Sequence, residues 1–313
     1  MITQNLKEYN STKPSVITVG TFDGIHIGHK EIINELCLIS KKKKLKSIIL
    51  SFSPHPKIVL KNSSDIMLIN SMDEKVDILN KYNLDYFLIK EFTIEFSRLT
   101  ALEFVRDILV NKLNVKHIIV GYDHHFGRNR DASIIQLKEF GELYNFEITE
   151  IKPKKVNNNS VSSTKIRNLL LDGNIELANK YLDSYFSLTG LVIKGMGRGK
   201  NLGFPTANIK INDEYKLIPR NGVYIVKSLI DSIIYFGMMN IGENPTFDDK
   251  NKSIEIHFFE LDYNIYDKKI KINILNRIRN EKKFKSPEFL MEQLKIDRDY
   301  SLKYIDENKI EID

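Results

Sequence analysis

The sequence predicts an α/β protein with a doubly wound parallel sheet in its first half and a small β-barrel with a closing helix in its second. Strand-like apolar runs alternate with helical patterns in the first half, which is typical of a parallel sheet covered on both faces. From about Ser187, short β-rich runs are separated by turn residues, as in a small barrel. A length of 313 residues favours two domains.

The first half contains five predicted strands and four predicted helices. The strands are Val16–Gly20, Ser47–Phe52, Tyr86–Lys90, His117–Gly121 and Phe146–Ile151, and the helices are Ile27–Ser40, Asp73–Tyr82, Ala101–Leu113 and Ser133–Tyr144. Ligands of such folds bind at the carboxyl ends of the strands, so motifs that follow a strand are the first candidates for a site.

A polar loop, Lys152–Ser160, and two short helices, Thr164–Leu171 and Ile175–Leu182, lead into the second half. Its predicted strands are Leu188–Ile193, Gly222–Leu229, Ile233–Met239, Ser253–Leu261 and Lys269–Ile278. Ser286 and Pro287 are suited to the N-cap and first position of a closing helix, Pro287–Tyr300. We therefore expect domains at residues 1–185 and 186–313.

Composition limits the function classes. No apolar run approaches the roughly 18 residues of a membrane span, so we expect no membrane partner. The polar N-terminus lacks a signal peptide's apolar core, and a single cysteine suits a reducing cytoplasm. The net charge of +6 comes from scattered basic residues, which favours a solvated surface over nucleic-acid binding. The oligomeric state is not readable.

The most informative stretch is G-T-F-D-G-I-H-I-G-H, residues 20–29, directly after the first of these strands. It predicts a helix N-terminus, where free amides and the helix dipole favour phosphate. His26 and His29 would share one helical face, where their imidazoles can donate hydrogen bonds to a phosphate chain. The glycines would let a ligand approach the backbone closely. Two other interpretations are a zinc site, with His55 or the His124–His125 pair as third ligand, and purely structural histidines.

Three further segments follow strands of the first half. They are F-S-P-H-P at residues 52–56, G-Y-D-H-H-F-G at 121–127 and S-S-T-K-I-R at 162–167. Taken singly, each has an ordinary explanation as a stiffened loop, an aromatic-lined loop or a helix cap. Together they bring polar, aromatic and basic side chains toward the phosphate motif.

The second half opens with the glycine-rich segment G-L-V-I-K-G-M-G-R-G-K-N-L-G-F-P-T-A-N, residues 190–208. Its backbone amides can wrap phosphate, although it is not a Walker A loop. Thr206 and Asn208 carry hard oxygen donors suited to Mg²⁺, unless they form a simple turn. Residues 240–247 are expected to form a loop. Glu255 alternates with apolar residues, and alternation alone leaves open whether it faces inward or toward solvent.

The four motifs of the first half resemble, in order, the nucleotidyltransferase (Rossmann-like) module of the bacterial bifunctional riboflavin kinase/FMN adenylyltransferase family, also called FAD synthetase. The resemblance implies that ATP and FMN combine to give FAD and pyrophosphate. It assigns catalytic roles to His26, His29 and Arg167 and places Asp123 and Phe126 beside the flavin. The ATP and its phosphates would be bound by Gly20, Phe22, Asp23, Gly28, Ser163 and Thr164.

Residues 190–208, with N-G-V-Y, N-I-G-E-N-P-T-F, E-I-H-F and R-N-E-K-K-F, resemble the riboflavin kinase module of the same family. That implies phosphorylation of riboflavin by ATP, with Glu255 as the general base and Thr206 and Asn208 at Mg²⁺. The phosphate loop would be formed by Gly195, Gly197, Arg198, Gly199 and Lys200, and flavin binding by Asn240, Arg279 and Glu281. The implied substrates are riboflavin, FMN and ATP.

The chain departs from the family's pattern at His124, Asp131 and Arg277, and the first two of these affect the fit of flavin in the first module. One rival function is a nucleotidyltransferase acting on another phosphate-bearing substrate, with only one module active. A second is a basic β-barrel that binds RNA, but the chain has no Trp and its tyrosines are dispersed.

Overall fold

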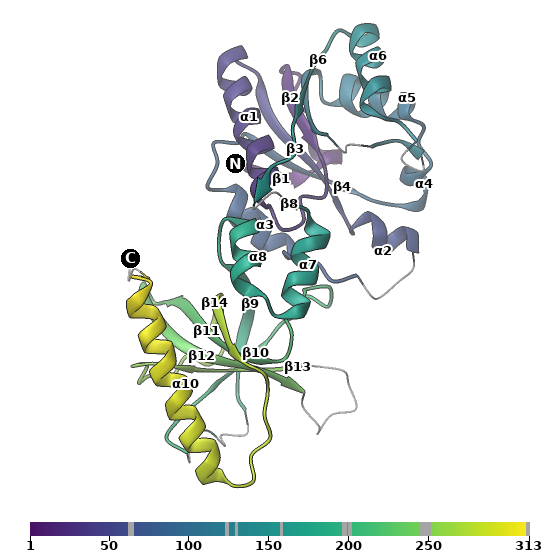
Figure 1. The fold of residues 1–313 in the computed structure, drawn as a ribbon. Coiled ribbons are helices and arrows are strands. Elements are labelled where there is room, and N and C mark those ends of the chain that lie inside the picture. The colour runs from purple at the N-terminus through teal and green to yellow at the C-terminus, as the bar shows by residue number, and fades with distance from the viewer. Residues whose placement is uncertain are drawn as a thin grey trace. The chain divides into compact units, whose positions relative to one another are not determined.

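The computed structural model describes residues 1–61, 66–122, 125–128, 131–156, 159–195, 199, 202–243 and 252–310. These residues form two compact units, Met1–Ser163 and Thr164–Asp313 (Figure 1). Each unit has its own sheet or barrel and its own buried core, and each carries a separate group of the polar residues predicted to be functional.

The first unit is built on a six-stranded sheet in the order β1-β4-β3-β2-β5-β6, and every pair of neighbouring strands is parallel. The strands are β1 (Ile2–Asn5), β2 (Ser15–Val19), β3 (Lys46–Ser53), β4 (Tyr86–Glu91), β5 (Val115–Gly121) and β6 (Glu147–Ile151). The predicted parallel sheet is confirmed. The strand β2, which precedes the histidine motif, lies in its middle.

Helices connect these strands. They are η1 (Leu6–Glu8), α1 (Ile27–Lys43), α2 (Pro56–Lys61), α3 (Met72–Leu79), α4 (Ile94–Ser97), α5 (Ala101–Glu103), the π-helical segment η2 (Phe104–Lys112) and α6 (Ile134–Tyr144). A short ribbon, β7 (Lys155–Val156) and β8 (Asn159–Ser160), precedes the end of the unit.

Neighbouring strand residues bury their side chains in two different cores. Ile17 and Leu50 pack in a cluster with residues of η2 and α6, whereas Val16 and Ile49 pack in a second cluster with residues of α1 and α3. Successive side chains of a strand point to opposite faces, so this division shows that helices cover both faces of the sheet. The doubly wound arrangement is therefore confirmed.

The edge strand β1 was not predicted from the sequence. Its four residues pair only with β4, and Ile2 at its start is about half exposed. An edge strand of this kind buries little apolar surface, so its sequence carries no clear alternation. The predicted helix at residues 101–113 is also less regular than expected, because it continues from α5 into the π-helical η2.

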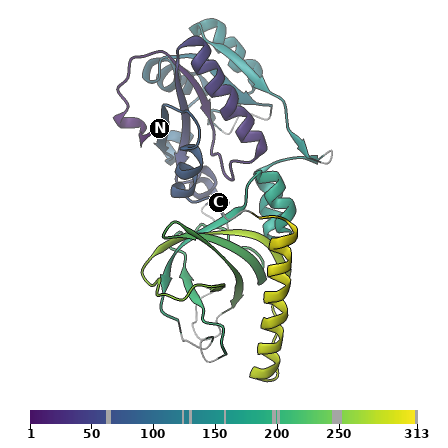
Figure 2. The same cartoon turned by 90° about the vertical axis from the view of Figure 1, so that its left-hand side faces the viewer.

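The helix α7 (Ser163–Asp172) belongs to the second unit from Thr164 onward. It is followed by α8 (Ile175–Leu182) and a closed barrel, β10-β13-β12-β11-β14-β9 (Figure 2). Its strands are β9 (Phe186–Ile193), β10 (Ala207–Lys210), β11 (Gly222–Ile230), β12 (Ile233–Glu243), β13 (Lys252–Phe258) and β14 (Lys269–Arg279). The helix α10 (Pro287–Glu307) follows the last strand. The predicted barrel with a closing helix is confirmed.

Two strands of the barrel differ from the prediction. The segment containing Asn208 forms strand β10, and β12 extends to Glu243, so Asn240 lies within a strand rather than in a loop. Both stretches are short and polar, and each is paired on two sides: β10 with β13 and β9, and the end of β12 with β13 and β11. The alternation of apolar and polar residues that marks the other strands is weak in these two stretches of the sequence.

The helices α7 and α8 contact the barrel. The Asn179 side-chain amide donates to the carbonyl oxygens of Ile274 and Leu275 and accepts from the Phe186 amide, and the Arg220 amide donates to Leu170. These contacts explain why α8 and most of α7 belong to the same compact unit as the barrel. The domain boundary between residues 185 and 186 stays a prediction.

Candidate active sites

The turn after β2 has an unusual backbone that is held from two sides. Phe22, Gly24 and Ile25 all have positive φ angles, of 47°, 88° and 36°. The Asp23 carboxylate accepts hydrogen bonds from the amides of Ile69 (2.9 Å) and Asn70 (3.2 Å). Non-glycine residues in this conformation persist only where the surroundings hold them, and these contacts supply part of that restraint.

A buried lysine also holds this turn. Lys75 of α3 is only 3% exposed, and its Nζ donates to the carbonyl oxygen of Thr21 at 3.0 Å. Its positive charge is one of the influences that lower the pKa of His29. Lys75 thus links α3 to the turn by a hydrogen bond and to His29 through its charge.

The two histidines form a stacked pair at the start of α1. His26 is the N-cap, and its Nδ1 accepts from the His29 amide at 3.4 Å. The rings stack with centroids 3.8 Å apart and planes 15° apart. Burial, followed by the charges of His26 and Lys75, holds the pKa of His29 well below its usual value. His29 is therefore neutral near pH 7, with an enclosed Nδ1 that has no hydrogen-bond partner in the described structure.

The glycines of the motif make room for rings of the protein itself. A Cβ on Gly28 would lie 3.2 Å from His26 Cε1, and one on Gly20 would lie 3.2 Å from Phe22 Cε2. The Phe22 ring is in turn 5.0 Å from the His29 ring. The space at these glycines is therefore filled by the rings of Phe22 and His26.

Of the other residues predicted for this site, one lies beside the histidine turn, and the rest lie elsewhere or outside the described residues. Ser163 donates to the Asp23 carbonyl at 2.8 Å, so it adjoins the histidine turn. Phe126 packs beside Phe104 in a core of the first unit and is only 7% exposed. Asp123 lies outside the described residues, and Thr164 and Arg167 belong to the second compact unit. Their approach to ATP and flavin stays a prediction.

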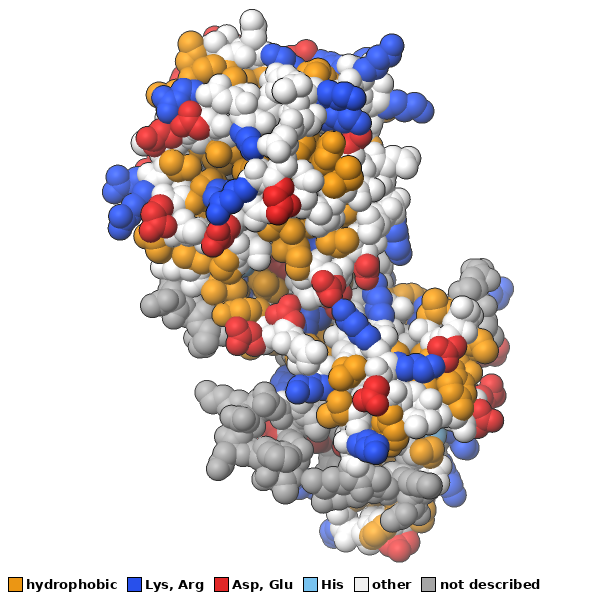
Figure 3. All heavy atoms as spheres, turned by 180° about the vertical axis from the view of Figure 1, so that it is seen from behind, with side chains coloured by type: hydrophobic (Ala, Val, Ile, Leu, Met, Phe, Trp, Pro, Cys, Tyr) orange, Lys and Arg blue, Asp and Glu red, His pale blue; other side chains and the backbone are white. Residues whose placement is uncertain are grey.

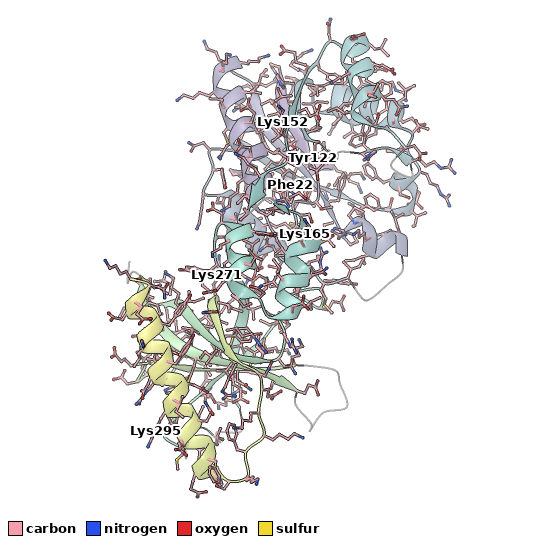
Figure 4. The ribbon with its side chains drawn as sticks, viewed as in Figure 1. Phe22, Tyr122, Lys152, Lys165, Lys271 and Lys295 are labelled. Atoms are coloured by element: carbon pink, nitrogen blue, oxygen red, sulfur yellow. The ribbon has the colours of Figure 1, made fainter. Side chains whose placement is uncertain are left out.

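Figure 4 labels Phe22 and Tyr122, which follow the adjacent strands β2 and β5.

The candidate kinase site is a row of polar residues across three neighbouring strands. Glu255 of β13 pairs directly with Asn208 of β10 on one side and with Asn240 of β12 on the other. Directly opposed residues project to the same face of a sheet. The Thr206 hydroxyl donates to Glu255 Oε2 at 3.2 Å, so the loop before β10 joins this row.

The structure of the barrel shows which face of β13 carries Glu255, which the alternation in the sequence left open. Ile254, Ile256 and Phe258 are buried, whereas Glu255 and His257 are half-buried on the opposite face of β13. Glu255 is thus placed among polar neighbours outside the apolar interior, where its charge is not costly.

His257 extends the contact between β13 and the loop that carries Thr206. Its Nδ1 lies 2.9 Å from the Pro205 carbonyl oxygen, which can only accept, so Nδ1 carries the proton. Burial lowers the pKa of His257. The bonds Glu255–Thr206 and His257–Pro205 together fix this loop against the strand.

Glycines again provide close approach in the second unit. The Asn208 side chain lies against Gly195, and the Phe204 carbonyl oxygen lies against Gly199, both too close for a Cβ. The Glu281 carboxylate and the Asn240 amide lie against the same α-carbon, that of Gly242. The predicted phosphate-loop residues Gly197, Arg198 and Lys200 are outside the described residues.

Arg279, predicted to bind flavin, pairs with Asp297 of α10. Its Nε and NH2 groups donate to the Asp297 carboxylate at 2.7–3.0 Å. Sequence analysis missed Asp297 and Lys75, because a single acidic or basic residue in an amphipathic helix looks like part of a solvated face. Only their burial distinguishes them from exposed neighbours.

Among the described residues, no group of three His, Cys, Asp or Glu side chains is arranged to hold a metal ion. None of the helices in the described ranges combines the length and hydropathy of a membrane span. On the face drawn in Figure 3, Lys and Arg side chains are interspersed with Asp and Glu in both units, which is typical of a solvated surface.

Comparisons with known proteins match both units. A family model described as FAD synthetase matches residues 8–165, and one described as riboflavin kinase matches residues 182–305. A bifunctional riboflavin kinase/FMN adenylyltransferase from Buchnera aphidicola (subspecies Schizaphis graminum) is 38% identical over 96% of both chains. Proteins of the same name from Listeria monocytogenes and Escherichia coli K12 are 35% and 32% identical, over 90% and 89% of both chains.

A solved structure has the same fold throughout. A protein from Streptococcus pneumoniae, described as a macrolide-efflux protein, superposes with a TM-score of 0.89 at 31% identity, covering 96% of this chain and 99% of that one. Macrolide efflux is the description of that protein only. Both family models and the curated relatives agree on two enzyme modules in the same order, and the chain belongs to the bifunctional riboflavin kinase/FMN adenylyltransferase family.

Proposed function

We propose a residue-level division of labour for the two reactions of this enzyme. The chain phosphorylates riboflavin to FMN with ATP and adenylylates FMN with a second ATP, giving FAD and pyrophosphate. The histidine turn after β2 serves the adenylylation, and the row around Glu255 serves the phosphorylation. The observation that carries this assignment is that each unit contains its own set of polar groups at a constrained loop.

In the adenylylation, a phosphate oxygen of FMN attacks the α-phosphorus of ATP and pyrophosphate leaves. This reaction needs in-line positioning and charge stabilisation more than a protein nucleophile. His26 accepts the His29 amide through Nδ1, so its proton is on Nε2, which can donate to a phosphate oxygen. The amides at the start of α1 add a favourable dipole.

The remaining predicted residues would complete the adenylylation site. Ser163, bonded to the carbonyl oxygen of Asp23, supports the turn, and Arg167 follows on the same helix with a charge suited to phosphate. Other contacts to ATP are assigned to Gly20, Phe22, Asp23, Gly28 and Thr164. Contacts to the flavin are assigned to Asp123 and Phe126.

In the phosphorylation, Glu255 takes the proton of the riboflavin 5′-hydroxyl as its oxygen attacks the γ-phosphorus of ATP and ADP leaves. General-base catalysis of this kind contributes about 10²–10⁴-fold. Asn240, Arg279 and Glu281 are assigned to the flavin side. Gly195, Gly197, Arg198, Gly199 and Lys200 are assigned to the ATP phosphates.

The donors present fit Mg²⁺. The Thr206 hydroxyl lies at 3.2 Å from Glu255, and Asn208 is paired with Glu255 across the strands, so hard oxygen atoms converge there. Mg²⁺ usually keeps several waters and binds substrate phosphates, so two protein donors suffice. When bound, the ion supplies positive charge that neutralises the phosphates.

Two variants test the division. His29→Ala should abolish conversion of FMN to FAD and leave conversion of riboflavin to FMN intact. Glu255→Ala should do the reverse, with a loss of about 10² or more in phosphorylation. Flavins separated after incubation with ATP and Mg²⁺, started once from riboflavin and once from FMN, measure both steps. Equal losses in both steps from either change would refute the assignment.

We further propose a cytoplasmic location. A chain with one cysteine can form no disulfide within itself, which suits a reducing compartment. ATP and riboflavin are both small soluble substrates. Fractionation of cells with an antibody to the chain would place it, and enrichment outside the cytoplasmic fraction would contradict the proposal.

A further inference from the structure

The contact between the barrel and α10 is centred on a buried ion pair. Arg279 ends β14, and Asp297 lies in the middle of α10 and is 1% exposed. The Arg279 Nε is 3.0 Å from both carboxylate oxygens, and NH2 is 2.7 Å from Oδ2. Gln293 donates to Oδ1 at 2.9 Å. This two-pronged geometry holds a guanidinium in one orientation.

The rest of the Arg279 side chain is also engaged. Its NH1 donates to the Asn280 carbonyl oxygen at 3.0 Å, and the guanidinium lies 5.8 Å from the centre of the Phe284 ring. All three nitrogens therefore donate within the protein. This arrangement lets Arg279 hold the following segment in place on the flavin side of the site.

The segment in question, residues 280–286, joins β14 to α10 and is tied at both ends. Arg279 fixes its start, and the ion pair to Asp297 fixes the helix that follows. We call these residues the strap. The strap carries Glu281, whose carboxylate lies against Gly242, where the Asn240 amide also lies at 3.2 Å from the Cβ position. Asn240 is directly opposite Glu255. The strap thus reaches the polar row of the kinase site.

We propose that Asp297 is a positioning residue for riboflavin phosphorylation. It orients Arg279, which fixes the strap and so places Glu281 beside Asn240. This inference rests on the proposed role of the Glu255 row. Loss of the Asp297 charge leaves the Arg279 guanidinium, whose side chain is only 21% exposed, without its carboxylate partner, so the start of the strap is no longer held in one orientation.

Asp297→Asn is the central test, because it removes the charge and keeps the size. We expect the KM for riboflavin to rise about ten-fold or more, the KM for ATP and kcat to change much less, and conversion of FMN to FAD on the same chain to stay unchanged. Asp299→Asn is the matched control. It removes the same charge from the same helix at an exposed site, where the ion-pair partner of Asp299 among the described residues is the neighbouring Arg298, and it should leave all parameters unchanged.

Two further variants keep the test decisive if Asp297→Asn fails to fold. Gln293→Leu removes one bond to the carboxylate and keeps both charges, so it should raise the riboflavin KM by a smaller factor. Asp297→Glu keeps the charge and should recover part of the affinity. A riboflavin KM that stays at the Asp299→Asn value in Asp297→Asn, or in Gln293→Leu if the former does not fold, overturns the inference, even if the melting temperature falls.

Failure of this inference is separable from failure of the proposed function. If Glu255→Ala abolishes phosphorylation and the variants at Asp297 and Gln293 behave as the control, only the positioning role is wrong. If Glu255→Ala keeps full activity, the polar row is not the kinase site and both proposals fall.

Discussion

Gly28 shows how a single residue in the histidine motif acts through its missing side chain. The His26 ring occupies the space that a Cβ at this position would need, and it stacks there on His29. The φ angle of Gly28 is not positive, so its backbone conformation does not itself require glycine. The requirement comes from the ring that passes over it.

We therefore expect Gly28→Ala to separate activity from stability. The new Cβ would meet His26 at 3.2–3.3 Å and shift the ring by a few tenths of an ångström. Formation of FAD from FMN should fall about ten-fold, because catalytic positioning is sensitive to such shifts. The free energy of unfolding should change by less than about 1 kcal/mol, since alanine is favourable in a helix. Product assays and thermal melts measure the two effects, and undiminished FAD formation would contradict the argument.

Glu255 illustrates what one residue's sequence context leaves undecided. The alternation with Ile254 and Ile256 requires that Glu255 lie on the other face of its strand, but either face is compatible with a strand pattern. The choice was made by β10 and β12, which bury the apolar residues and place Asn208 and Asn240 beside the carboxylate. Neither neighbour is close to Glu255 in the sequence.

The helix α3 shows how an element with no motif of its own supports a site. Its start is a capping box, in which Ser71 and Glu74 exchange side-chain and backbone hydrogen bonds. A cap of this kind stabilises a short helix by about 1 kcal/mol. This fixes the first turns of α3, so that Lys75 can reach the Thr21 carbonyl oxygen.

Lys75→Met tests this support. The change keeps most of the apolar length and removes the donor to Thr21, and a hydrogen bond from a charged group is worth about 1.5–3 kcal/mol. Conversion of FMN to FAD should fall about ten-fold or more, and conversion of riboflavin to FMN should not change. Lys81→Met, at an exposed position just after the same helix, is the control. Equal activity of the two variants would show that α3 does not support the turn.

At the scale of elements, pairing partners explain why β10 and the end of β12 are strands although their sequences do not predict it. The polar stretches at β10 and at the end of β12 have little strand propensity of their own and become strands by pairing with a neighbouring strand on each side, β9 and β13 for β10 and β11 and β13 for β12. By contrast, β2 to β6 and β9, β11 and β14 were predicted close to their observed bounds, because they are buried enough to carry a continuous or alternating apolar pattern.

The whole molecule consists of two units that each have a core and a candidate site. In the first unit, two apolar clusters enclose the sheet, and in the second, Phe204, Val223 and Met238 belong to a cluster that includes Leu294 of α10. The proposed residues of each reaction lie mainly within one unit. FMN is the product of one unit and the substrate of the other.

A mixture of His29→Ala and Glu255→Ala chains should therefore convert riboflavin to FAD, although neither variant does so alone. The first makes FMN, which is free to diffuse to the intact adenylylation site of the second. Flavin separation over time checks this, with each variant alone as the control. If the mixture accumulates FMN and forms no FAD, FMN made on one chain does not reach the site on another.

The order of motifs and the apolar patterns were sufficient to predict the two architectures, the histidine turn at a strand end and the family. These depend on short-range spacing, which the sequence displays directly. Which rings fill the glycine positions, which face Glu255 takes and which charges are buried at Lys75 and Asp297 were decided only by the tertiary structure. They depend on contacts between residues far apart in the chain. Burial strengthens the electrostatic interactions of a charged group, and burial is a property of the folded molecule.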